Sequence, residues 1–255
     1  MCLILVAWQA HPDYPLVVAA NRDEFHARPS APAAFWDDRP SILAGRDLEA
    51  MGTWLGITRE GRFAAVTNYR DPRDAAAPGS ASRGSLVSGY LENGDAAADF
   101  VAAVAGEGAS YRGFNLLAGD RSDLWWTSNR GDGARQLVAG IYGLSNHLLD
   151  TAWPKVERGK RALREALRDT PAIETLFELI APTEAADDAE LPDTGVGPER
   201  ERMLSAMRIV SPGYGTRCST VLLQGRDGRV QFAERLFTPA GDATDTLRYE
   251  FSLSD

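Results

Sequence analysis

The sequence has few of the residues that form cross-links or bind metals. Its 255 residues include two cysteines, Cys2 and Cys218, and three histidines. Two cysteines do not make the disulfide framework of a small secreted domain, so we expect both to be thiols in a reducing compartment. No CxxC or HExxH spacing is present. We therefore predict neither a metal site nor a cofactor.

Long apolar runs and an excess of positive charge are also missing. No segment is apolar enough to span a bilayer, and the first residues do not have the pattern of a signal peptide. The formal net charge is -9, which argues against a nucleic-acid partner because binding phosphates requires a basic surface. We expect a cytoplasmic protein without integral membrane association, and the sequence leaves its oligomeric state unknown.

The overall composition is that of a globular protein, with 44% hydrophobic and 25% charged residues. A chain of this length can bury one large core, so we predict a single domain over residues 1–255. Apolar runs bounded by turn residues predict strands, and 3.6-residue periodicity predicts helices. The predicted strands cover residues 2–8, 16–20, 54–58, 62–67, 114–118, 123–127, 136–139, 141–144, 219–224, 229–235 and 248–252. The predicted helices cover residues 85–91, 96–105, 154–168, 171–180 and 200–207, and residues 70–84 and 183–201 are predicted loops.

Asp95 is the predicted N-cap of the second helix, and Pro171 is placed in the first turn of the fourth. Groups of antiparallel strands separated by helix pairs indicate an α+β fold, not alternating βαβ units. Two mostly antiparallel sheets stacked face to face, with a helix pair outside each, would satisfy this order. That four-layer αββα sandwich goes beyond what periodicity alone establishes.

The first predicted hairpin brings several reactive side chains together. Its strands run antiparallel, so the end of the second strand returns beside the start of the first. This places the run Asn21-Arg22-Asp23-Glu24 next to Cys2. A thiol, a guanidinium and two carboxylates are therefore expected at one end of a sheet.

Cys2 has the position required of an N-terminal nucleophile. Removal of Met1 would give Cys2 a free α-amino group, whose ordinary pKa of about 7.7–8.0 suits a general base. A neighbouring Arg22 would favour the thiolate, and Asp23 could orient the ammonium. The alternative is that Cys2 is a small buried hydrophobe, which spacing alone favours. Asn68 and Asn146 follow predicted strands and could stabilise an oxyanion, although asparagine is also favoured at turns.

The tetrapeptide Asn21-Arg22-Asp23-Glu24, together with the opening Met1-Cys2, resembles the signature of the NRDE family, also called the transport and Golgi organisation protein family. Further matching blocks occur in order over nearly the whole chain. They are Arg28-Pro29, Trp36, Ala44-Gly45-Arg46-Asp47, Gly52-Thr53-Trp54-Leu55-Gly56, Thr67-Asn68-Tyr69-Arg70, Ser82-Arg83-Gly84, Phe114-Asn115-Leu116, Gly143-Leu144-Ser145-Asn146, Trp153-Pro154-Lys155-Val156, Leu191-Pro192-Asp193-Thr194-Gly195 and Tyr214-Gly215-Thr216-Arg217.

This resemblance implies the αββα fold of the N-terminal-nucleophile (Ntn) hydrolases. Within that superfamily the family is most similar to the cysteine branch of choloylglycine hydrolases and penicillin acylases, which cleave non-peptide amides or transfer acyl groups. The implied catalytic residues are Cys2, Arg22, Asp23, Asn68, Asn146 and Arg217. The expected substrate-binding residues are Asn21, Glu24, Tyr69 and His147.

One departure from the hydrolase branch affects the carboxylate. There, two residues separate the early arginine and aspartate, whereas Arg22 and Asp23 are adjacent in this chain. Neighbours on a strand point to opposite faces. Glu24, on the same face as Arg22, is therefore a second candidate for the carboxylate role.

Two functions fit these observations. The first is an amidohydrolase or acyltransferase that acts on a small acylated substrate through Cys2. The second is a carrier of a hydrophobic acidic ligand such as acyl-coenzyme A, a lipid or haem, since the family's eukaryotic members are linked to Golgi organisation, lipid metabolism and haem mobilisation. The basic helix Lys155–Arg168 could bind coenzyme A phosphates, but a solvated helix face is the favoured interpretation. We expect Cys218 to be a core thiol.

Overall fold

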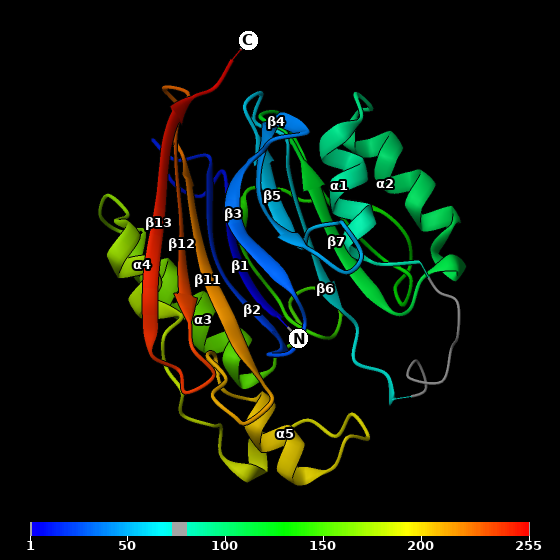
Figure 1. Ribbon diagram of the computed structural model, residues 1–255, viewed down its shortest axis with the longest axis vertical. Coiled ribbons are helices and arrows are strands. Elements are labelled where there is room, and N and C mark those ends of the chain that lie inside the picture. The colour runs from blue at the N-terminus through cyan, green and yellow to red at the C-terminus, as the bar shows by residue number, and fades with distance from the viewer. Residues whose placement is uncertain (1, 73–80, 255) are drawn as a thin grey trace. The chain divides into compact units, whose positions relative to one another are not determined.

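The computed structural model describes residues 2–72 and 81–254 (Figure 1). The chain divides into two compact units. Unit 1 consists of Met1–Ala27, Ala139–Ser145 and Leu149–Glu250, and unit 2 of Arg28–Val138, Asn146–Leu148 and Phe251–Asp255. The single domain expected from the sequence stays a prediction.

Within its described residues, unit 1 is built on a six-stranded sheet with the strand order β10-β1-β2-β11-β12-β13. Its strands are β1 (Cys2–Trp8), β2 (Leu16–Phe25), β10 (Gly140–Leu144), β11 (Tyr214–Gln224), β12 (Arg229–Phe237) and β13 (Ala243–Ser252). The last residues of β13 belong to unit 2. Because β2 pairs antiparallel with both β1 and β11, its side chains have neighbours on two strands.

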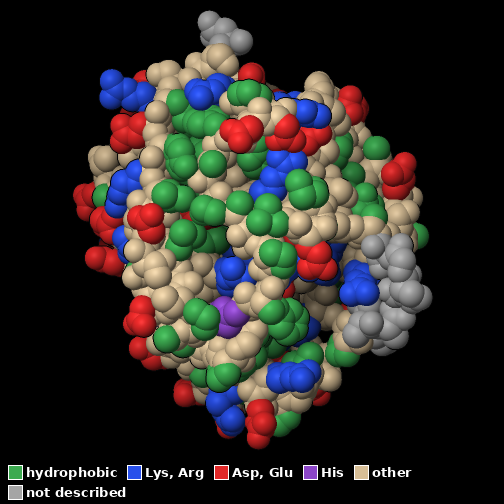
Figure 2. Space-filling view, viewed as in Figure 1, with side chains coloured by type: hydrophobic (Ala, Val, Ile, Leu, Met, Phe, Trp, Pro, Cys, Tyr) green, Lys and Arg blue, Asp and Glu red, His purple; other side chains and the backbone are tan. Residues whose placement is uncertain are grey.

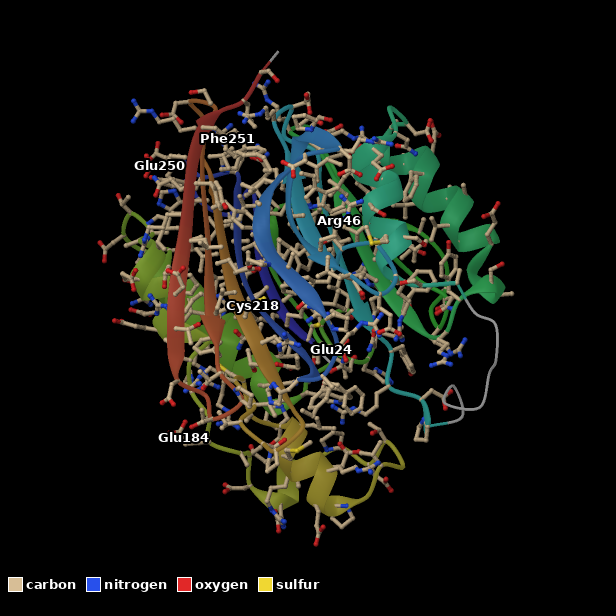
Figure 3. The ribbon with its side chains drawn as sticks, in the orientation of Figure 1. Glu24, Arg46, Glu184, Cys218, Glu250 and Phe251 are labelled. Atoms are coloured by element: carbon tan, nitrogen blue, oxygen red, sulfur yellow. The ribbon has the colours of Figure 1, made fainter. Side chains whose placement is uncertain are left out.

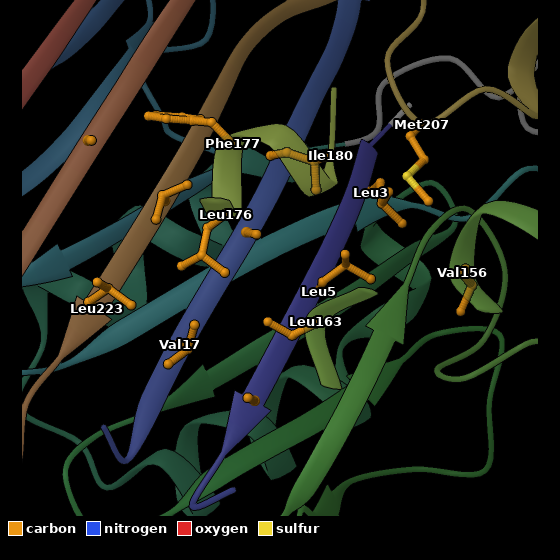
Figure 4. Packing of buried hydrophobic residues seen from close by; sticks show 14 of the residues in the cluster. Leu3, Leu5, Val17, Val156, Leu163, Leu176, Phe177, Ile180, Met207 and Leu223 are labelled. Atoms are coloured by element: carbon orange, nitrogen blue, oxygen red, sulfur yellow. The ribbon is translucent and has the colours of Figure 1, made fainter. Parts of the chain in front are cut away.

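Two helices, α3 (Pro154–Ala166) and α4 (Ile173–Leu179), cover one face of this sheet (Figure 1). Leu3 and Leu5 of β1 pack there against Leu163 and Leu176 (Figure 4). Side chains alternate along a strand, so Cys2 points away from these helices. The long connection to β11 contains the 3-10 turn η3 (Asp188–Glu190) and helix α5 (Pro198–Leu204).

Unit 2 contains, in its described part, a seven-stranded antiparallel sheet with the order β3-β4-β5-β6-β7-β8-β9. Its strands are β3 (Ser30–Trp36), β4 (Arg39–Asp47), β5 (Leu55–Thr58), β6 (Phe63–Asn68), β7 (Phe114–Gly119), β8 (Leu124–Ser128) and β9 (Arg135–Gln136). Helices α1 (Gly84–Glu92) and α2 (Ala97–Gly106) pack on one face through buried residues such as Tyr90 and Val101, and η2 (Gly108–Ser110) follows α2.

The predicted α+β class, with antiparallel sheets and helix pairs, is confirmed. The hairpin β3–β4 was not predicted from the sequence because prolines interrupt its apolar pattern. Pro32 lies where the pairing of the edge strand β3 with β4 is irregular, which is a position where a strand tolerates proline. A segment that alternates apolar and polar residues is therefore still compatible with an edge strand when it includes proline.

Two predicted helix starts are wrong. Ala96, without a side-chain cap, is the N-cap of α2, not Asp95. Helix α4 begins after Ala172, so Pro171 precedes the helix. Of the predicted loop 70–84, residues 73–80 lie outside the described residues, and its last residue already belongs to α1. In the described part of the chain, no helix is long and apolar enough to cross a membrane.

A close backbone contact in unit 2 gives a test of the packing. A Cβ added to Gly52 would lie 2.6 Å from the carbonyl carbon of Gly84. We predict that Gly52→Ala lowers the free energy of unfolding by about 1–3 kcal/mol, because backbone atoms must move to relieve the overlap. Urea denaturation measures the loss.

The matched control is Gly106→Ala at the end of α2, where an added Cβ meets nothing within 4 Å. This variant should be unchanged or more stable by less than about 1 kcal/mol, since alanine is the better helix former. Equal losses at both positions would contradict the close packing of Gly52.

Candidate active site at the first strands of unit 1

Strand β2 aligns the thiols of Cys2 and Cys218 on either side of an arginine. Cys2 of β1 pairs with Arg22 of β2, and Arg22 pairs on its other side with Cys218 of β11. Residues directly opposite in antiparallel strands share a face. Arg22 also lies 3.7 Å from a carboxylate oxygen of Glu24, the next residue along β2 on the same face. The predicted juxtaposition of Cys2 with Arg22 is therefore present in the structure.

Cys2 is enclosed, with only 8% of its surface exposed. Burial raises the pKa of its thiol above the ordinary value, and the Asp23 carboxylate acts in the same direction. A hydrogen bond from the Asp23 backbone N–H and the charge of Arg22 lower the pKa and so oppose these two effects. The hydroxyl of Ser145 donates to the Cys2 carbonyl at 3.0 Å. The effect of burial on the pKa is the largest, so the surroundings in unit 1 favour the neutral thiol.

Cys218 is buried as well, in agreement with the prediction of a core thiol. Burial raises the pKa of this thiol well above its ordinary value, and a hydrogen bond and charge from buried Glu234 raise it further. Figure 3 shows Cys218 on β11 and Glu24 on β2. Glu234 was not identified from the sequence, where it is one acidic residue within an apolar strand. Of the two thiols, Cys218 is the one held more firmly in its neutral form.

Asp23 takes the face opposite Arg22, as strand alternation predicts. It is 2% exposed, and the Thr216 hydroxyl donates to its Oδ1 at 2.6 Å. The Tyr214 hydroxyl donates to its backbone carbonyl at 3.2 Å. Burial raises the pKa of Asp23, while the charge of Lys155, the hydrogen bond from Thr216 and the charge of Arg22 lower it in opposition. Asp23 thus contacts Cys2 through its backbone N–H, and its carboxylate belongs to a buried polar layer beneath β2.

Lys155 belongs to the same layer, which corrects the interpretation of the basic helix. It is 2% exposed, and its Nζ donates to the Leu204 carbonyl at 2.9 Å. Arg161 and Arg164 of the same helix are exposed. The basic residues on the solvated face of the helix therefore lie further along it and do not include Lys155. Lys155 belongs to a block that matches the family, but its burial was not predicted, because it resembles the other basic residues of the run.

Asn21 anchors the polar layer to the loops below the sheet. Its Nδ2 donates to the carbonyls of Ile180 at 2.8 Å and Met207 at 2.9 Å. Its Oδ1 accepts a hydrogen bond from the Ser219 hydroxyl at 2.6 Å. With no exposed surface, Asn21 has a structural role in unit 1, and its contact with substrate stays a prediction.

Arg217 lies at an irregularity in β11, between the pairs Thr216–Asp23 and Cys218–Arg22. Bulges of this kind redirect a side chain and are common beside active sites. The Arg217 guanidinium donates to the carbonyls of Phe25 at 3.1 Å and His26 at 3.2 Å. Arg217 therefore holds the end of β2.

Unit 2 brings the remaining predicted residues together at the end of β6. The Asn146 Nδ2 donates to the Asn68 carbonyl at 3.0 Å, and the rings of Tyr69 and His147 have centroids 4.9 Å apart. Burial lowers the pKa of His147, and the charge of Arg70 lowers it further.

Buried Asn115 of β7 supports this group of side chains. Its Nδ2 donates to the Thr67 hydroxyl at 3.1 Å and to the His147 carbonyl at 3.0 Å. Its motif was visible in the sequence, but its supporting role was not. The predicted oxyanion role of Asn68 and Asn146 is not tested by these contacts and stays a prediction.

Within residues 2–72 and 81–254, no group of three or more His, Cys, Asp or Glu side chains could hold a metal ion. On the face drawn in Figure 2, acidic and basic side chains are intermixed. In unit 1, the Cys2 thiol, the Arg22 guanidinium and the Asp23 backbone N–H lie together at the start of β1 and the end of β2, and such groups are suited to nucleophilic chemistry.

Sequence comparison settles the family. The model of the family "Transport and Golgi organisation 2" matches residues 1–239. The chain belongs to this family. It is 38% identical over 277 residues to the human Transport and Golgi organization protein 2 homolog, covering 99% of both chains. It is 26% identical to Transport and Golgi organization protein 2 of Drosophila melanogaster, covering 93% of both.

Solved structures show the fold of this chain. The C2A mutant of conjugated bile acid hydrolase from Clostridium perfringens matches with a TM-score of 0.51 and 8% identity, covering 100% of this chain and 98% of that one. The Caenorhabditis elegans ortholog of N-acylethanolamine-hydrolyzing acid amidase matches with a TM-score of 0.50 and 11% identity, covering 87% and 92%. The fold is that of the Ntn hydrolases, as the sequence resemblance implied.

The hydrogen bond between Thr216 and Asp23 gives a test of the polar layer. Thr216→Val removes the donor to Asp23 and the acceptor of the Ile209 N–H. We predict a loss of about 1–3 kcal/mol in the free energy of unfolding. The donor stabilises the charged carboxylate, so the loss should be larger at about pH 8 than at about pH 5.

Urea denaturation at both pH values measures this loss. Thr244→Val, on exposed β13, is the matched control and should change stability by less than about 0.5 kcal/mol. A loss at Thr216 that is the same at both pH values would show that the hydroxyl does not act on a titrating Asp23.

Proposed function

We propose that this protein is a cysteine Ntn amidohydrolase or acyltransferase in which Cys2 is the nucleophile after removal of Met1. Its substrate is a small molecule with a non-peptide amide or an acyl thioester. The observation that carries the proposal is the placement of Cys2 at the start of β1, opposite Arg22 and hydrogen-bonded to the Asp23 N–H. The Ntn-hydrolase fold supports it, and so does the C2A bile acid hydrolase, a protein whose second residue is also a cysteine.

The burial of the thiol explains why the α-amino group is needed. The surroundings of Cys2 in unit 1 raise its pKa, so Arg22 alone does not supply a thiolate near neutral pH. An α-amine on the same residue has an ordinary pKa of about 7.7–8.0 and can accept the thiol proton. In this mechanism the amine is the base, and Arg22 stabilises the developing thiolate.

The reaction proceeds in two balanced steps. The Cys2 sulfur attacks the carbonyl carbon, and the C–N or C–S bond of the substrate breaks as the leaving group takes the proton held by the α-ammonium. Water or an acceptor amine then attacks the thioester, which releases the acid or the new amide and returns the thiol. In the proposal, Asn68 and Asn146 stabilise the oxyanion, as the family resemblance implies. Tyr69, His147 and Glu24 contact the substrate.

A second function is favoured by one observation, the enclosure of the Cys2 thiol in its neutral form. A non-catalytic carrier of a hydrophobic acidic ligand, such as acyl-coenzyme A, a lipid or haem, needs no reactive thiol. The two functions differ in what they require of residue 2.

Limited alkylation measures the reactivity of Cys2. We predict that the untagged protein lacks Met1 and that limiting iodoacetamide near neutral pH modifies Cys2 in preference to Cys218. The physical reason is that Glu234 and burial hold Cys218 neutral, whereas the amine can deprotonate Cys2. Intact mass and peptide mapping give both results. Retention of Met1, or equal labelling of the two thiols in the folded protein, argues for the carrier.

Replacement of Cys2 separates turnover from binding. On a panel of acyl amides and acyl thioesters, we predict that Cys2→Ala abolishes turnover but retains affinity within about tenfold, because the acyl group still binds. Cys218→Ala is the matched control and should retain turnover. Full turnover by the folded Cys2→Ala variant would eliminate the catalytic proposal.

A further inference from the structure

The burial of Lys155 requires a physical explanation. Lysine is almost never fully buried unless it is paired, yet Lys155 of α3 is 2% exposed. Its Nζ donates to the Leu204 carbonyl, but a backbone carbonyl does not neutralise an ammonium. A buried ammonium is stabilised by a buried carboxylate on the same face of a sheet, and Asp23, which is 2% exposed, lies on the face that α3 and α4 cover.

A single short segment connects Lys155 to the end of β2. Lys155 donates to the Leu204 carbonyl at 2.9 Å, and Asn21 donates to the Met207 carbonyl at 2.9 Å. The Ile209 N–H donates to the Thr216 hydroxyl oxygen at 2.8 Å, and that hydroxyl donates to Asp23. Residues 204–209 thus hold side chains from α3, β2 and β11 in one buried layer.

The charged groups around Asp23 come from several elements. Arg22 of β2 lies on the opposite face and has Glu24 as an ion-pair partner. The Cys2 thiol of β1 contacts the Asp23 backbone N–H, and the Tyr214 hydroxyl of β11 contacts its carbonyl. Lys155 of α3 is a cation on the same face as the Asp23 carboxylate, and its charge lowers the pKa of Asp23 against the effect of burial.

We propose that Lys155 is a positioning residue for the reaction of Cys2, whose buried ammonium favours the charged form of the Asp23 carboxylate at the end of β2. This inference rests on the proposed function and on the role predicted for Asp23 from the sequence, in which its carboxylate orients the Cys2 α-ammonium. It assigns the first helical residues of α3 to support of the nucleophile. The exposed basic residues further along the helix have no part in it.

The titration of Asp23 tests the inference directly. Carboxyl carbon NMR of aspartate-labelled protein gives its pKa, and Asp23→Asn identifies the signal. We predict that Lys155→Met raises the pKa of Asp23 by about one unit or more, because removal of a nearby opposite charge favours the neutral acid. Lys155→Arg should restore most of the difference.

Lys160→Met is the matched control on the same helix. Lys160 is half-buried and pairs with Asp150 at 2.7 Å, outside the layer that contains Asp23. Replacement of Lys160 should leave the pKa of Asp23 unchanged. An Asp23 pKa that is unchanged in Lys155→Met, or shifted equally by both variants, overturns the proposal.

A stability measurement decides the matter if Lys155→Met does not fold well enough for NMR. Removing one member of a buried pair leaves an uncompensated charge, whereas replacing both members is far less costly. The double variant Asp23→Asn/Lys155→Met should therefore melt at a higher temperature than Lys155→Met. Additive losses in this cycle would show that the two charges are not coupled.

The outcomes separate the inference from the proposed function. If iodoacetamide selects Cys2 and Lys155→Met moves the Asp23 titration, both stand. If Cys2 is selected but Asp23 does not move, the role of Lys155 falls and the function stands. If Cys2 in the unmodified protein is no more reactive than Cys218, the function falls and the positioning role falls with it.

Discussion

The pairing of β2 with β1 on one side and β11 on the other is the constraint on which the candidate site depends. It places Arg22 opposite both Cys2 and Cys218 and so fixes which charges act on the thiols. A shift of one residue in this register would send every side chain of β2 to the other face. Arg22 would then lie among the apolar residues beneath α3 and α4, and Asp23 would face the thiols.

The buried polar layer beneath β2 is what secures this register. Asn21 binds two carbonyls of the loops below the sheet, and Asp23 is bound by Thr216. Each of these hydrogen bonds is lost if β2 slides, and the buried groups left without partners would destabilise the fold. The same contacts that hold the fold therefore hold the reactive end of β2, which accounts for the number of polar side chains there.

Sequence reasoning predicted the arrangement along β1 and β2 because antiparallel pairing and alternation are local rules. They placed Arg22 beside Cys2 and put Asp23 on the other face. The supporting residues could not be predicted in this way. Lys155 and Thr216 belong to blocks that match the family, but they lie on elements more than a hundred residues from Asp23 in sequence, and the blocks do not reveal which residues they join in the fold. Glu234 and the supporting role of Asn115 were missed for the same reason, since a polar residue within an apolar strand does not reveal its partner.

If Cys2 is the nucleophile, its sulfur forms a covalent bond with an acyl group during the reaction. This bond is tested by mixing the protein briefly with acyl thioesters or acyl amides, stopping the reaction with acid and measuring the mass of the protein. We predict a mass increase equal to the acyl group, which is located on the Cys2 peptide, is removed by hydroxylamine and is absent from Cys2→Ala. Substrate turnover without any adduct on Cys2, or with the acyl group on Cys218, would contradict it.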